Sequence, residues 1–213
     1  MSDTQIDLAS LLCSRLCHDL LSPVGAMNNG LELLADEHDP AMQKRCMDLL
    51  SDSAKSAVDK LKFFRLAFGA AGGFGDMVDP AEAKAVVEPL VTGSGRTTLE
   101  WAVPSAFFPK RVIKILLNLV LIANDTLVRG GTLSVGAEDR GHEQEIVISA
   151  NGPKVILDEA IGAALLGQLD PSQIDSRTAA AWMVRGLAMR DGGLVQLAQP
   201  DLEHKIFGAI IRT

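Results

Sequence analysis

Two long amphipathic segments joined by a short turn constrain the first third of this chain more than any other feature. Apolar residues recur in steps of three and four from Ala9 to Leu34, and again from Cys46 to Phe68. This spacing is typical of helices that bury one face. The polar stretch 37–40 separates them, and its proline suits the first turn of a new helix. The pattern therefore predicts helices over about 6–36 and 40–68 that form an αα-hairpin.

A hairpin of this kind gives each helix only one partner and leaves apolar surface exposed. Two copies would close a four-helix bundle with a shared core. We therefore expect a homodimer in which the hairpins form the interface.

The remaining two thirds of the chain follow a different pattern. Residues 71–79 are rich in glycine and end before Pro80, which indicates a linker. Helical patterns then occur at 80–91, at 108–127 and, as one or two helices, at 157–190. Strand patterns occur at 97–103, 132–137, 143–150, 194–198 and 205–211. The order predicts an α+β fold, with helices packed on one face of a mixed sheet. We expect a hairpin domain at 1–70, a linker at 71–79 and an α/β sandwich domain at 80–213.

Charge and composition exclude several classes of protein. The net charge of −7 over 213 residues argues against general nucleic-acid binding, which requires a basic surface. No apolar run is long enough to span a membrane, and the N-terminus lacks a positively charged leader pattern. We expect a cytoplasmic protein with no membrane or nucleic-acid partner. The cysteines at 13, 17 and 46 lack a second pair of metal ligands, so no metal site is expected.

The candidate catalytic residue is His18, in the sequence CHDLLSP at residues 17–23. On a helical wheel it lies about 180° from the apolar stripe, so it points to solvent from a helix that is otherwise buried. Asp19 can hold one ring nitrogen protonated and leave the other nucleophilic. A lone exposed histidine would ordinarily have no function, but its combination with Asp19, Ser22 and Pro23 favours a catalytic site with His18 and Asp19 as its members.

The residues around His18 on the exposed face are small or apolar, which would let another protein approach the imidazole and bury surface against it. We expect a docking surface formed by Leu11, Ser14, Leu21, Ser22, Gly25 and Asn29 of the first helix, with Phe64, Arg65 and Phe68 of the second.

The sequence CHDLLSPVGA at residues 17–26 resembles the phosphoacceptor motif of two-component histidine kinases and, more narrowly, that of the bacterial ChpT-type histidine phosphotransferases. The resemblance implies that His18 is the nucleophile and phosphoryl carrier of a phosphorelay, and that Asp19 orients its ring. The donor would be the receiver domain of a hybrid histidine kinase. The acceptors would be cell-cycle response regulators such as CtrA- and CpdR-like receivers. Since receivers bring their own Mg²⁺, this chain would need no cofactor.

Residues from about 80 onward resemble the ATP-binding domain of histidine kinases, the Bergerat fold, but depart from it at nucleotide-binding positions. Asn118 matches the first of the two asparagines that this family places near the phosphates and Mg²⁺, whereas Ile122 stands at the second. Ala150 stands where the family has the aspartate that contacts adenine. Lys154 replaces a glycine of the same turn, where a long side chain would crowd the backbone. We therefore expect a degenerate domain that does not bind ATP.

Two other functions are compatible with the sequence. A histidine kinase core with an unusual nucleotide site would label His18 with ATP and Mg²⁺ alone. A non-catalytic scaffold that sequesters receivers would keep its binding and its output after His18→Ala. The phosphotransferase is the function that we expect.

Overall fold

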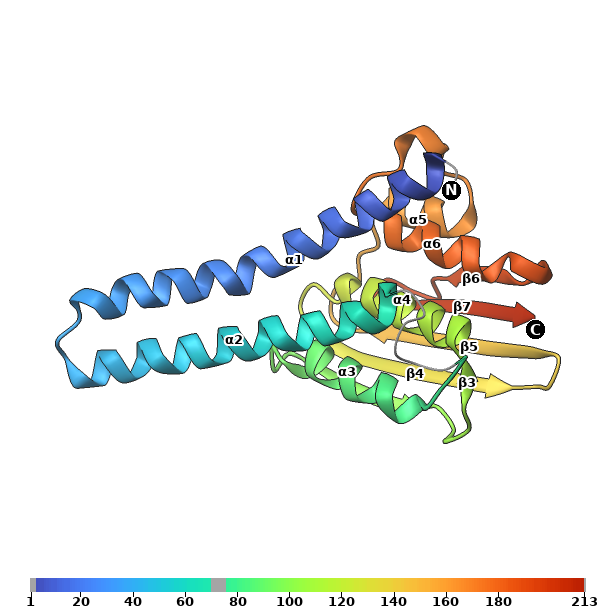
Figure 1. Ribbon diagram of the computed structural model, residues 1–213. Coiled ribbons are helices and arrows are strands. Elements are labelled where there is room, and N and C mark those ends of the chain that lie inside the picture. Colours follow the sequence, from blue (N-terminus) through green and yellow to red (C-terminus); the bar gives the residue numbers. More distant parts are fainter. Residues whose placement is uncertain (1–2, 70–75, 213) are drawn as a thin grey trace.

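The computed structural model describes residues 3–69 and 76–212. Its first two elements are the expected helices, α1 (Asp3–Asp36) and α2 (Pro40–Phe68). Asp39 accepts a hydrogen bond from the backbone N–H of Ala41 and so caps the start of α2, where Pro40 occupies the first turn. The two helices form an antiparallel hairpin whose turn lies far from the rest of the molecule (Figure 1). The predicted hairpin is confirmed.

The second part of the chain combines a sheet with several helices. Its elements are β1 (Met77–Val78), α3 (Pro80–Thr92), β2 (Thr97–Ala102), β3 (Phe108–Pro109), α4 (Lys110–Thr126), β4 (Gly131–Asp139), β5 (Glu143–Asn151), α5 (Glu159–Leu166), α6 (Ala179–Ala188), β6 (Leu194–Ala198) and β7 (His204–Arg212), with short 3₁₀ turns η1 (Pro171–Gln173) and η2 (Arg190–Gly192). Five strands form one sheet in the order β2-β4-β5-β7-β6, in which only the β2–β4 pair is parallel.

One face of the sheet carries the helices, and the other is open (Figure 1). Along β5 the side chains of Ile146, Ile148 and Ala150 are buried, while Val147 between them is exposed. This alternation is the signature of a strand with one covered face. The predicted α+β fold, a helical pair followed by a sheet with helices on one face, is confirmed.

The hairpin and the sheet domain share one core. Helix α4 is buried on nearly all sides, as expected of a helix between a sheet and other helices. Phe63, Leu66 and Ala67, at the end of α2, belong to the same cluster of buried residues as α4. This end of the hairpin is therefore anchored in the second domain, while the turn end extends away from it.

Two expected boundaries differ from the structure. The linker predicted at 71–79 falls mainly on residues 70–75, outside the described residues, and its last part forms β1, which pairs with β3. The helix expected at 108–127 begins at Lys110, and Phe108–Pro109 form β3 before it. The one or two helices expected at 157–190 are two, α5 and α6. Gly167 ends α5 in the left-handed conformation (φ 72°), which favours glycine.

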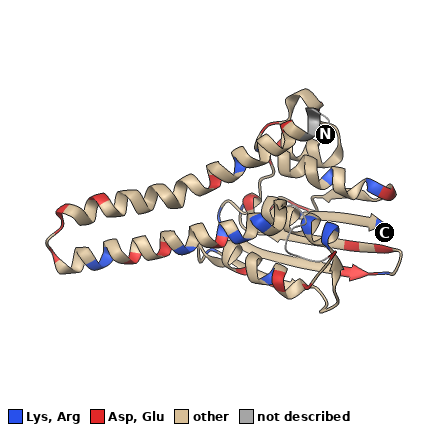
Figure 2. Ribbon diagram, viewed as in Figure 1, with Lys and Arg blue, Asp and Glu red and all other residues tan. Residues whose placement is uncertain are grey.

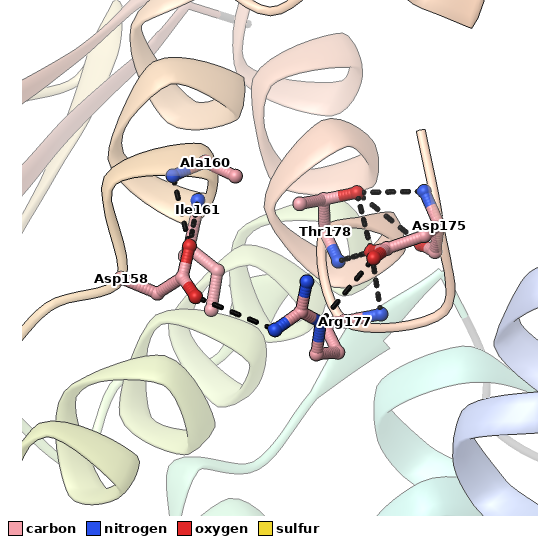
Figure 3. Close-up of polar contacts among 6 residues, drawn as sticks. All are labelled: Asp158, Ala160, Ile161, Asp175, Arg177 and Thr178. Atoms are coloured by element: carbon pink, nitrogen blue, oxygen red, sulfur yellow. Dashed lines mark hydrogen bonds and ion pairs between the residues drawn. The ribbon is translucent and has the colours of Figure 1, made fainter. Parts of the chain in front are cut away.

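Aspartate side chains cap the start of α5 and the turn just before α6 (Figure 3). Asp158 accepts hydrogen bonds from the N–H groups of Ala160 and Ile161 at the start of α5. Asp175 accepts from the backbone N–H groups of Arg177 and Thr178 and from the Thr178 hydroxyl. The Arg177 guanidinium lies between the carboxylates of Asp158 (3.6 Å) and Asp175 (3.2 Å), and thereby links the two caps.

Not every residue of the predicted apolar stripes is buried. Pro23, Ser53 and Ala57 are buried between the two helices. Leu31 and Leu61, which the periodicity placed on the buried faces, are 57% and 48% exposed. Leu31 lies in the outer part of the hairpin, where each described helix packs mainly against the other, and two helices cannot cover a wide apolar stripe.

Candidate functional site

His18 lies in the middle of α1, near the point where the hairpin leaves the sheet domain. Its side chain is 83% exposed, as the helical wheel predicted. The side chains that support it are much less exposed, at 18% for Asp19 and 15% for Arg15. The imidazole therefore projects into solvent, while the polar side chains next to it are largely covered.

Asp19 uses its two carboxylate oxygens for different partners. Oδ1 lies 3.3 Å from Nδ1 of His18, a long contact, and Oδ2 accepts a 2.8 Å hydrogen bond from Nε of Arg15. An ionised carboxylate can only accept hydrogen bonds, so this arrangement favours the tautomer with the proton on Nδ1. Nε2 then keeps its lone pair and is available as a nucleophile.

Arg15 and Lys60 tie this site to the second helix and to the sheet domain. Nη2 of Arg15 donates to the Asp125 carboxylate at 2.7 Å, and Nζ of Lys60 donates to the main-chain oxygen of Asp19 at 2.8 Å. Burial works to lower the pKa of Arg15, but attraction to Asp125 and hydrogen bonds to both carboxylates outweigh it and raise that pKa. Arg15 is therefore always charged here.

Arg15, Lys60 and Asp125 are not among the site residues expected from the sequence. The spacing of four between Arg15 and Asp19 is a local signal that could have found this pair. Asp125 gave no such signal, because 110 residues separate it from Arg15 and only the packing of α4 against the hairpin brings them together.

Most of the expected docking residues are accessible. Ser14, Leu21, Ser22, Asn29 and Arg65 are exposed, and Leu11, Gly25 and Phe68 are partly buried. Leu11 also lines an open groove of about 410 Å³ that lies between α1 and the sheet domain, where Ile174 and Trp182 form the opposite wall. The exposed face of α1 thus continues onto the second domain.

Phe64 is a correction to the predicted docking surface. It is only 2% exposed, and its ring stacks on that of Phe68 with centroids 5.3 Å apart. Its edge also meets Phe63, at 5.7 Å. Phe64 is part of the core because the sheet domain covers this end of α2, which the sequence of the helix alone does not reveal.

The positions that match the nucleotide-binding residues of histidine kinases are mostly internal. Asn118 is fully buried, and its amide donates to the backbone oxygens of Lys114 and Ala67, which joins α4 to the end of α2. Ile122 and Ala150 are buried apolar side chains. Within residues 3–69 and 76–212 no group of three or more His, Cys, Asp or Glu residues is arranged to hold a metal ion. No helix of these residues has both the length and the apolar composition needed to cross a membrane.

Comparison with known proteins assigns this arrangement to a family. Residues 80–203 match the model of the histidine phosphotransferase C-terminal domain. A curated relative, the protein phosphotransferase ChpT of Brucella abortus (strain 2308), is 40% identical over 147 residues, which cover 69% of this chain and 68% of that protein. A solved structure of a bacterial phosphotransferase aligns with a TM-score of 0.84 at 32% identity, and the alignment covers 98% of this chain and 97% of that one. The chain belongs to the histidine phosphotransferase family.

Proposed function

We propose that this protein carries a phosphoryl group on His18, between the aspartate of one receiver domain and that of another. The observation that carries the proposal is the imidazole of His18, which is largely exposed while Asp19 beside it is held in place by Arg15. An exposed ring can enter the active site of a docked receiver, and a fixed carboxylate can set its tautomer.

The proposed reaction is an in-line displacement at phosphorus. The lone pair of Nε2 of His18 attacks the phosphoryl group, the bond between phosphorus and the aspartate oxygen of the donor breaks, and that aspartate leaves as a carboxylate. The Nδ1 proton stays on the ring, and Asp19 stabilises the positive charge that the ring then bears. Transfer to the acceptor reverses these steps. The receiver supplies Mg²⁺, so catalysis by this chain consists of positioning and charge stabilisation.

For the partners, we propose the receiver domain of a hybrid histidine kinase as donor and response regulators of the CtrA and CpdR kind as acceptors. The likeness to the protein phosphotransferase ChpT supports this choice. The groove between Leu11 and Trp182 supports a docked receiver that touches both α1 and the sheet domain.

We also propose that the sheet domain does not bind ATP. The side chain of Asn118 is fully buried and its amide nitrogen is bonded within the core, so the group does not reach a surface where phosphate or Mg²⁺ could bind. The buried methyl group of Ala150 offers no acceptor to an adenine amino group.

The hairpin supports a further proposal, that two copies form a four-helix bundle. Val24 and Leu31 on α1, and Met47 and Val58 on α2, are about half exposed, and each follows a residue of the inward face by one position. One position is a rotation of about 100°. Because the helices are antiparallel, these rotations bring both sets to the same side of the hairpin. The result is an apolar face that a second copy can cover.

Labelled phosphate tests the proposed function in two reactions, one with ATP and Mg²⁺ alone and one with a kinase-phosphorylated receiver domain. We expect acid-labile label on this chain only in the second reaction. His18→Ala should lose it, and His38→Ala, at the exposed hairpin turn, should keep it. Label in the first reaction would identify a kinase. Docking of the receiver with no label in either reaction would identify a scaffold.

A further inference from the structure

Arg15 is the only lysine or arginine in α1, whereas α2 carries several basic residues along its length (Figure 2). Both sides of its guanidinium are used, with Nε on Asp19 and Nη2 on Asp125. A planar guanidinium can hold two carboxylates in fixed directions, which an ammonium group cannot. The largely covered side chain of Arg15 therefore has one defined geometry, three residues before His18.

We infer that Arg15 is a positioning residue for phosphoryl transfer, an inference that rests on the proposed function of His18. Arg15 fixes the Asp19 carboxylate so that Oδ1 faces Nδ1 of His18. Without it, Asp19 can rotate away, and the ring is then free to place its proton on Nε2, the nitrogen that has to attack. The maximum rate of transfer depends on this tautomer, whereas receiver docking does not.

A charge balance supports the same role. Asp19, next to His18, and Asp125, on the other side of the Arg15 guanidinium, contribute two carboxylates, and Arg15 and Lys60 contribute two positive charges. The arriving phosphoryl group is negative. Removal of Arg15 would leave one carboxylate without a counter-charge next to that group, and the repulsion would oppose transfer.

The link to Asp125 gives the sheet domain a part in the chemistry that requires no nucleotide. Asp125 belongs to α4, whose buried apolar side chains pack in the shared core. Its carboxylate holds the end of the Arg15 side chain that Asp19 does not. The position of α4 is thereby transmitted through Arg15 and Asp19 to the imidazole.

The test uses the full-length protein with the variants Arg15→Gln, Arg15→Lys and Asp125→Asn. Arg45→Gln is the matched control, because Arg45 is exposed and lies early in α2, near the hairpin turn, which extends away from the sheet domain (Figure 1). The initial rate of labelling is measured against the concentration of phosphorylated receiver. The tautomer of His18 is measured separately, from the ¹⁵N chemical shifts of its ring in the free protein. Thermal melting checks that each variant is folded, and Asp125→Asn, which keeps the shape of its side chain, replaces Arg15→Gln if that variant fails to fold.

We expect Arg15→Gln to lower the maximum rate by about 10- to 100-fold, and to change the half-saturating receiver concentration by less than about threefold. Arg15→Lys should also have a low maximum rate, because an ammonium group cannot hold two carboxylates in fixed directions as a guanidinium does. Asp125→Asn should lower the maximum rate by about 3- to 10-fold. In the free Arg15→Gln protein, the ring of His18 should change from the Nδ1–H tautomer, which we expect in wild type, towards the Nε2–H tautomer. A maximum rate equal to that of wild type in Arg15→Gln, or an unchanged tautomer, would overturn the inference. If the wild-type protein takes no label from any receiver, the proposed function fails, whereas the tautomer measurement still decides the role of Arg15.

Discussion

The sheet domain and the outer part of the hairpin differ in how far their apolar side chains are buried. In the sheet domain Leu116, Ile146 and Phe207 are fully buried. In the hairpin Leu31 and Met47 are more than half exposed. A single chain therefore completes the core of one region and leaves that of the other open. The core that the sheet domain shares with the end of α2 is thus complete within one chain, whereas the outer part of the hairpin keeps an apolar face, which the proposed second copy would cover.

The site lies at the border between these two regions. Asp19 and Arg15 belong to α1, Lys60 to α2 and Asp125 to α4, so the polar network crosses from the hairpin into the sheet domain. His18 extends from this network into solvent. The stable region can thereby hold the site in place, while the exposed face of α1 remains accessible to a partner.

The largest effect that separates the two regions should come from the core. Leu116→Ala removes a fully buried side chain of α4, and we expect it to lower the free energy of unfolding by about 2–5 kcal/mol. The loss should not depend on protein concentration, because the cavity forms within one chain. Urea unfolding at two protein concentrations measures both quantities. Leu202→Ala, at an exposed turn, is the control and should cost less than about 0.5 kcal/mol. A loss below about 1 kcal/mol for Leu116→Ala would contradict the contrast in packing.

A smaller effect, and one that does depend on concentration, is expected in the hairpin. Leu31→Glu places a charge on the apolar face proposed for the dimer, and should weaken association by about 2 kcal/mol or roughly 30-fold in Kd. Light scattering at micromolar concentration should then show a larger fraction of monomer. Leu33→Glu is the matched control, because Leu33 is equally exposed but precedes the inward-facing Leu34 and so lies on the other side. An equal response of the two variants would contradict the assignment of this face.

The same contrast explains which features could be predicted from the sequence. Helix and strand patterns depend on neighbouring residues, so the hairpin, the α+β fold and the exposure of His18 all followed from spacing. Phe64 did not, because a phenylalanine on a regular stripe looks the same whether its neighbour is a docked receiver or the domain's own core. The contact between Arg15 and Asp125 was likewise hidden, since it exists only once α4 packs on the hairpin.

The smallest effect should come from acid, and should be confined to the sheet domain. Desolvation works to raise the pKa of Asp175, but the hydrogen bonds from Thr178 and Arg177 outweigh it and hold this pKa below its usual range. A carboxyl group whose pKa is lowered by folding contributes stability that is complete above about pH 4 and is lost as the pH falls through the folded-state pKa. Since this carboxylate is nearly half exposed and screened by solvent, the contribution should stay below about 1 kcal/mol.

The comparison of wild type with Asp175→Asn at several pH values isolates this contribution. At pH 6 the variant should melt about 2 °C lower than wild type, because its amide oxygen is an uncharged and weaker acceptor for the hydrogen bonds that end on Oδ1, and its NH₂ group cannot accept from Arg177 as Oδ2 does. As the pH falls from 4 towards 3, the wild-type carboxyl group takes up a proton and the two melting temperatures should converge. Hydrogen exchange should place the loosening at the start of α6 and not in the hairpin. A difference that stays constant from pH 6 to pH 3 would mean that the charge of Asp175 contributes nothing to the stability of this loop.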